Sequence, residues 1–136
     1  GFPDETRELA FDTIELNRQF NSDNTSCSIL VPFHGTELHS YAVKKGYIDP
    51  NVICAVSNSG GSILNMPQWS KEDMMRLRDV FAMYIKFPKN RWQEIKEAEG
   101  DLDLRAKSRK EFIETYWSDS NAKIEDDIAE AAKGLF

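Results

Sequence analysis

A nearly continuous apolar run, residues 26–33, constrains the fold of this chain more than any other segment. A run of this length and composition is typical of a strand that is covered on both faces, as in a parallel α/β sheet. His34 and Gly35 come directly after it, and Thr36 then offers an N-cap hydroxyl to a short helix that Gly46 ends. The pattern predicts a strand that passes directly into a helix.

A helix is predicted on the other side of this strand, over residues 3–20. One helical stripe of this segment is formed by Leu9, Thr13, Leu16 and Phe20, and Phe11 and Ile14 widen it. We expect this stripe to pack on an apolar surface. The turn formers of residues 21–26 separate this helix from the strand. Helix, turn and strand together make the second half of a βαβ unit.

The second half of the chain is predicted to be helical. After a brief strand at residues 52–56 and a flexible Gly-Ser loop, Ser70 and Asp73 resemble a capping box for a helix over residues 71–86, which Pro88 ends. Further helices are expected over residues 90–99, 104–117 and 121–133. The predicted fold class is α/β but predominantly helical, with a first unit at residues 1–56 and a helical carboxyl-terminal extension at residues 57–136.

Charge and hydropathy exclude two classes of partner. The net charge of −6 over 136 residues lacks the basic footprint of a nucleic-acid binder. No apolar run approaches the roughly 18 residues that cross a bilayer, and no leader opens the sequence. We therefore expect a soluble cytoplasmic protein without a transmembrane segment. The chain opens on Gly1 and not on a methionine, so we expect a fragment of a longer protein.

Few residues of this chain have side chains that could take part in catalysis or bind a metal. Cys27 and Cys54 lack C-x-x-C spacing and are expected to be buried free thiols. His34 and His39 lie five residues apart, which does not match a helical zinc pair. His34 is the more interesting of the two because ligands gather at the carboxyl ends of parallel strands, but an exposed loop histidine is the simpler explanation.

Three segments resemble the radical SAM superfamily. The stretch GFPDETRE is similar to the Gly-x-Pro-x-Glu-Thr segment after the fifth strand of those enzymes. The stretch SILVPFHGTELHSYAVKKGYID resembles their sixth strand and the segment after it, with Pro-aromatic-x-Gly-Thr-x-Leu and then Lys-Gly-Tyr-Ile. Residues 62–99 resemble the carboxyl extension of the members that carry a cobalamin-binding domain. The likeness covers about residues 1–99.

The resemblance implies a fold, a function and a set of site residues. The fold would be the end of a partial (β/α) barrel, with a helical extension after it. The parent enzyme would cleave S-adenosylmethionine at a 4Fe-4S cluster to a 5′-deoxyadenosyl radical, with cobalamin as a cofactor that this type can use. Val31, Phe33 and His34 would wall the S-adenosylmethionine pocket, with His34 turned toward a small-molecule or lipid-like substrate, and Glu5 would position the cofactor or the pocket edge.

The cluster motif of that family, C-x-x-x-C-x-x-C, is absent from this sequence. The chain alone is therefore expected to be inactive and to need the amino-terminal remainder of a parent enzyme, and an exposed sheet edge could lead to self-association. The alternative is a non-catalytic interaction module that docks a partner through Trp69, Trp92 and Trp117, although core packing explains those tryptophans more simply.

Overall fold

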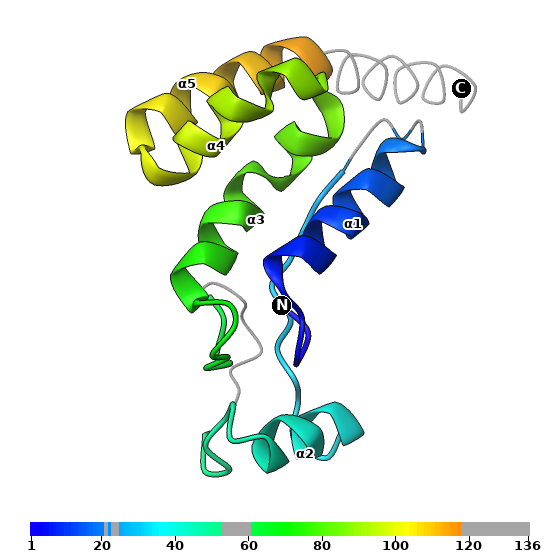
Figure 1. Ribbon diagram of the computed structural model, residues 1–136, viewed down its shortest axis with the longest axis vertical. Coiled ribbons are helices and arrows are strands. Elements are labelled where there is room, and N and C mark those ends of the chain that lie inside the picture. The colour runs from blue at the N-terminus through cyan, green and yellow to red at the C-terminus, as the bar shows by residue number, and fades with distance from the viewer. Residues whose placement is uncertain (21, 23–24, 53–60, 118–136) are drawn as a thin grey trace, which may run out of the picture.

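The computed structural model describes residues 1–20, 22, 25–52 and 61–117. Five α-helices succeed one another among these residues: α1 (Arg7–Arg18), α2 (Glu37–Lys44), α3 (Lys71–Lys86), α4 (Trp92–Gly100) and α5 (Leu102–Phe112). A 3-10 turn, η2 (Lys89–Arg91), precedes α4, and a π-helical turn, η3 (Ile113–Trp117), continues α5. Figure 1 shows α1 beside α3, α4 and α5 at one end, and α2 at the other. The described part of the chain is predominantly helical, as predicted.

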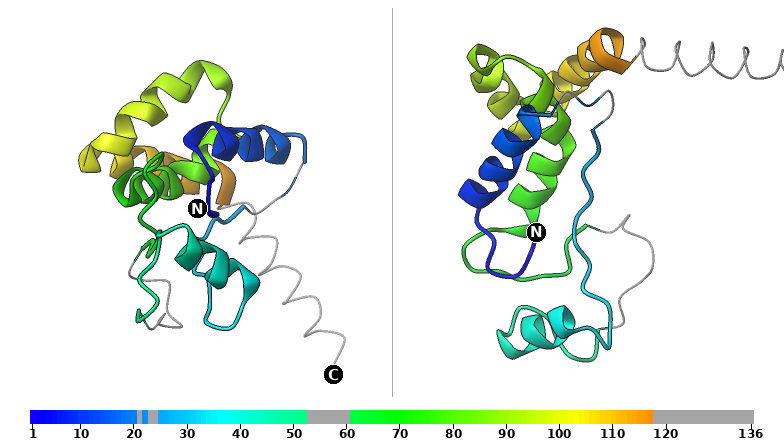
Figure 2. Two further views of the ribbon diagram at one scale, coloured as in Figure 1. Left: turned by 60° about the horizontal axis from the view of Figure 1, so that its bottom comes forward. Right: turned by 90° about the vertical axis from the view of Figure 1, so that its right-hand side faces the viewer.

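The strand predicted over residues 26–33 is not formed. Figures 1 and 2 show this segment as an extended trace that leads toward α2, and none of its residues belongs to a β-ladder. A strand needs a second strand to exchange hydrogen bonds with, and the described residues supply none; their one β-bridge joins Met66 to Trp69. The described residues therefore show the helical part of the predicted fold class, and the end of a barrel stays a prediction.

Two predicted helix starts, at Thr36 and Ser70, are confirmed by their caps, whereas α1 begins at Arg7 and not at residue 3. The Oγ1 of Thr36 accepts from the His39 N–H at 3.2 Å, and the Oγ of Ser70 accepts from the Asp73 N–H at 3.1 Å. The Ser70 hydroxyl also donates to the Asp73 carboxylate at 2.7 Å, whereas in a capping box this side chain would accept from the N-cap backbone N–H. Gly46 has a φ of +73°, the left-handed geometry expected where α2 stops.

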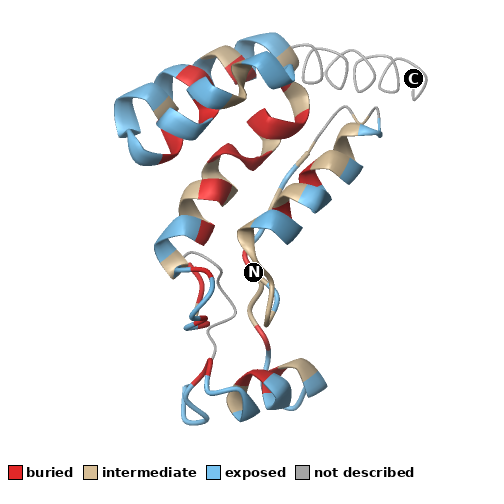
Figure 3. Ribbon diagram, viewed as in Figure 1, coloured by how far each residue is buried: buried red, intermediate tan, exposed pale blue. Residues whose placement is uncertain are grey.

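The buried face of α1 differs from the prediction. Ala10 and Ile14 are buried, whereas Leu9, Leu16 and Phe20 are about half exposed or more. The burial colours in Figure 3 show buried turns on the side of α1 that meets α3. Arg18 sets this orientation, because its guanidinium donates to the carbonyls of Tyr84, Ile85 and Phe87 at the end of α3.

One apolar core links the two predicted units. It contains Ile14 and Ile29 from the first unit, and Leu77 and Ile95 from the second. The division at residues 56 and 57 stays a prediction. Residues 53–56 and 121–133, where a strand and a helix were predicted, lie outside the described residues. Among the described helices, none is long and apolar enough to cross a membrane.

Candidate functional site

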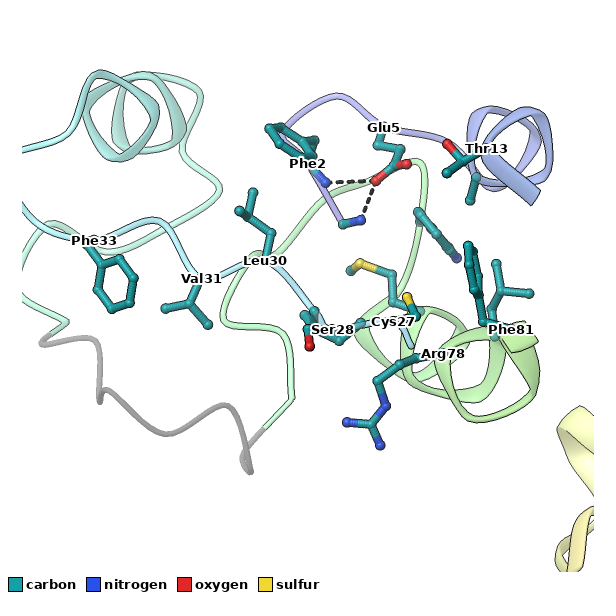
Figure 4. Close-up of a pocket in the computed structure, with 16 residues that line it drawn as sticks. Phe2, Glu5, Thr13, Cys27, Ser28, Leu30, Val31, Phe33, Arg78 and Phe81 are labelled. Carbon is teal, nitrogen blue, oxygen red and sulfur yellow. Dashed lines mark hydrogen bonds and ion pairs between the residues drawn. The ribbon is translucent and has the colours of Figure 1, made fainter. Parts of the chain in front are cut away.

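A cavity of about 500 Å³ lies between the amino-terminal turn, the extended segment, α1 and α3. Figure 4 shows its walls: Phe2 and Glu5 on one side, Leu30, Val31 and Phe33 on another, and Arg78 and Phe81 from α3. Ala10, Met74, Leu77 and Trp69 complete an apolar lining. Cavities of about this volume, mostly apolar with a few polar groups, are the usual form of small-molecule sites.

The structure brings three of the four predicted cofactor-binding residues into this cavity: Glu5, Val31 and Phe33. The Glu5 carboxylate accepts the backbone N–H of Phe2 at 2.8 Å and a second hydrogen bond from the Gly1 nitrogen. These bonds fix the carboxylate at the amino-terminal turn. Phe33 is 50% exposed, so one side of its ring is open to a ligand.

His34, the fourth predicted residue, does not line the cavity. Its Nε2 lies 2.7 Å from the carbonyl oxygen of Val52, and its ring centroid is 4.2 Å from that of His39. The turn that begins at Phe33 causes this, because the Thr36 N–H donates to the Phe33 carbonyl at 3.2 Å and reverses the chain. The role of His34 toward a substrate stays a prediction.

The charged groups at the cavity are already paired. The Arg78 guanidinium donates to Asp79 at 2.6 Å, and Asp79 also accepts from Arg105 at 2.8 Å. Cys27, a free thiol as predicted, is partly buried, and burial raises its pKa above the ordinary value, so the thiol stays protonated at neutral pH. The cavity therefore offers a neutral apolar surface more than a charged one.

A cluster that the sequence did not predict ties this turn to α2. Asp4 has a φ of +67°, and its carboxylate accepts from the hydroxyls of Tyr41 and Tyr47, the latter at 2.5 Å. The Lys45 ammonium lies 3.4 Å away. These two hydroxyl groups, and then Lys45, hold the pKa of Asp4 below its usual range. The contacts hold the turn that carries Glu5 against the end of α2.

Sequence reasoning also missed the wall that α3 supplies. Arg78 and Phe81 lie one turn apart on that helix, and both border the cavity. A helical period shows which residues share a face, but it does not show which of them border a cavity. Phe2 could have been suggested by its position three residues before Glu5.

The described residues suit some of the expected cofactor groups and not others. The apolar walls and the volume suit a planar group such as adenine. The thiols do not suit an iron-sulfur cluster, since the whole sequence has two cysteines. Within residues 1–20, 22, 25–52 and 61–117, no three His, Cys, Asp or Glu side chains gather as metal ligands would. Comparison with protein-family models, curated proteins and solved structures finds no match.

Proposed function

We propose that this chain is the carboxyl-terminal portion of a radical SAM enzyme, of the type that can use cobalamin. One observation supports this most: the residues that the motif resemblance assigns to cofactor binding, Glu5, Val31 and Phe33, border the same cavity although they come from two segments. A chance likeness of two short motifs would not be expected to bring these side chains around one cavity.

In this proposal the chain supplies walls and not the reacting group. Val31 and Phe33 cover the adenine ring of S-adenosylmethionine, and the Glu5 turn closes the edge of the site against water. A 4Fe-4S cluster, which the amino-terminal remainder would hold, would supply the electron for reductive cleavage of S-adenosylmethionine. The substrate is a small or lipid-like molecule that meets the cofactor beyond this wall.

The test uses the longer polypeptide that the upstream coding sequence specifies. Purified without oxygen, it should show the absorption of a 4Fe-4S cluster and should release 5′-deoxyadenosine from S-adenosylmethionine. Phe33→Ala removes an aromatic contact and should weaken S-adenosylmethionine binding about fivefold, from roughly 1 kcal/mol for ring stacking. Phe20→Ala is the matched control, since Phe20 is also exposed but borders no part of this cavity.

His34→Ala should lower turnover in that polypeptide while the cluster spectrum stays unchanged. Unchanged turnover would instead leave His34 as a loop residue that contacts Val52 and His39. An upstream sequence with no C-x-x-x-C-x-x-C motif would end the proposal, because no residue of this chain replaces those thiolates.

The alternative is a non-catalytic interaction module that binds neither iron nor S-adenosylmethionine in any form. The exposed apolar side chains of Leu9 and Leu16 on α1, and of Phe20 just beyond its end, favour a partner surface there. Docking through tryptophans is less favoured, since Trp69 is 6% exposed and Trp92 packs on the core. The side chain of Trp117 lies outside the described residues. Iron analysis of the longer polypeptide separates the two functions.

A further inference from the structure

A tight turn over residues 2–5 carries the Glu5 wall of the cavity. The Glu5 N–H donates to the Phe2 carbonyl at 3.0 Å, and Pro3 and Asp4 occupy the two central positions, Asp4 with a φ of +67°. Proline followed by a residue of positive φ is the pattern of a type II turn, whose usual second central residue is glycine or asparagine. The backbone of this turn does not require aspartate, so what Asp4 adds is its carboxylate.

The Asp4 carboxylate ties this turn to the end of α2. It accepts from the hydroxyl of Tyr41, on α2, and at 2.5 Å from that of Tyr47, just beyond the helix. Tyr47 is a firmly held donor because it is only 9% exposed and its backbone is bonded on both sides. Its N–H donates to the Ala42 carbonyl at 2.9 Å, and its carbonyl accepts from the Asn65 N–H at 2.8 Å.

The start of the same helix holds another wall of the cavity. The Phe33 carbonyl accepts from the Thr36 N–H at 3.2 Å and from the Thr36 hydroxyl at 2.7 Å, and Thr36 is the N-cap of α2. Figure 4 shows Phe33 and Glu5 on different sides of the cavity that both of them line. Hydrogen bonds therefore connect α2 to the Phe33 wall at its start and, through Asp4, to the Glu5 wall at its end.

We propose that α2, with Tyr47 beyond its end, is a brace that sets the separation of these two walls, and that Asp4 is the positioning residue through which the brace holds Glu5. The inference rests on the proposed function only for the identity of the ligand. A ligand bound between two walls that are already in place does not have to order them, so it binds more tightly. Asp4, Tyr41 and Tyr47 are not among the described residues that line the cavity, so substituting them removes no contact with the ligand.

Amide hydrogen exchange in the 136-residue chain tests the brace without a ligand. The double variant Tyr41→Phe, Tyr47→Phe removes both donors and leaves the sequence of the turn intact. We expect the Glu5 amide to exchange about fivefold faster in this variant, because the turn is no longer held to α2. The Arg105 amide, which donates to the Asp101 carbonyl at the start of α5, should not change. Unchanged exchange at Glu5 would overturn the proposal.

Aspartate variants separate the carboxylate from the turn itself. Asp4→Asn suits the same turn position and should change the exchange of Glu5 in the same direction, which keeps the test valid even if the double variant does not fold. Asp4→Gly also permits the positive φ and removes the acceptor altogether. In that background the two Tyr→Phe substitutions should add no further change, because their partner is already absent. A further increase in exchange would show that the tyrosines act on the turn by another route.

The longer polypeptide shows whether the brace governs binding, with S-adenosylmethionine as the probe. The double variant should raise its Kd about fivefold, a coupling at the low end of the usual range. Tyr84→Phe is the matched control, because its hydroxyl also donates to a carboxylate, that of Glu99, and neither residue borders the cavity. It should lower stability and leave Kd unchanged. An unchanged Kd in the double variant, or an equal loss in Tyr84→Phe, would refute the brace. A polypeptide that binds no S-adenosylmethionine refutes the proposed function, and the exchange at Glu5 then decides the brace alone.

Discussion

Tyr84→Phe should destabilise the chain by more than its small chemical change suggests. Tyr84 is 1% exposed, and its hydroxyl donates to the Glu99 carboxylate at 2.6 Å. The same carboxylate oxygen accepts from Arg7 at 2.7 Å, which ties the start of α1 to the end of α4. Burial and the Glu99 carboxylate raise the pKa of Tyr84 above its ordinary value, so the hydroxyl remains a donor at neutral pH.

The loss of unfolding free energy in Tyr84→Phe depends on which contacts of the side chain are lost and which stay. Phenylalanine keeps the edge contacts of this ring with Phe11 and Trp92, at centroid distances of 5.0 and 5.4 Å, so packing changes little. A hydrogen bond to a buried charged group contributes about 2 kcal/mol. With a urea dependence of about 2 kcal/mol per molar, the midpoint of unfolding should fall by about 1 M.

Urea unfolding monitored by tryptophan fluorescence measures this loss, and Tyr41→Phe is the control. The Tyr41 hydroxyl also donates to a carboxylate, that of Asp4, but Tyr41 is 41% exposed and water can replace its bond. The reasoning fails if the two variants shift the midpoint equally. A double-mutant cycle of Tyr84→Phe with Glu99→Gln should show a coupling energy, because the two groups share one hydrogen bond.

Three further predictions test the packing, the caps and the charges. Ile14→Ala should cost about 2–5 kcal/mol of unfolding free energy and Leu16→Ala almost none, and urea midpoints that ranked the other way would contradict the orientation of α1. Ser70→Ala should cost about 1 kcal/mol in the same assay, by loss of the α3 cap. The pKa of Asp4 is lowered in the folded chain, so the stability that its ionised form contributes is present above about pH 4 and is lost in acid. The Tm advantage over Asp4→Asn should therefore shrink between about pH 4 and pH 2, and a constant difference would refute the linkage.

The elements that local signals determine were predictable from the sequence. α3 spans Lys71–Lys86 as predicted, because its cap, its apolar period and the proline beyond its end act within a few residues. Whether residues 26–33 pair as a strand was not predictable in the same way. A strand is a relation between two segments, and an apolar run carries no information on whether its partner is present. The face of α1 depends in the same way on what packs against it.

The candidate site likewise combines features that the local sequence determines with features that depend on packing. Glu5, Val31 and Phe33 were named from motifs, and their common cavity depends on packing between segments that the motifs do not describe. His34 comes directly after Phe33, yet the turn at Thr36 sends its side chain toward Val52. A motif gives the order of residues, and the direction of a loop side chain depends on hydrogen bonds formed later in the fold.

The exposed apolar residues indicate which part of this chain would pack against another polypeptide segment. Phe2, Leu9, Leu16, Phe20 and Phe33 are all at least half exposed, whereas Lys71–Gly100 contributes none of the large exposed apolar side chains. The middle helices therefore bury their apolar residues within the chain, and the first third does not.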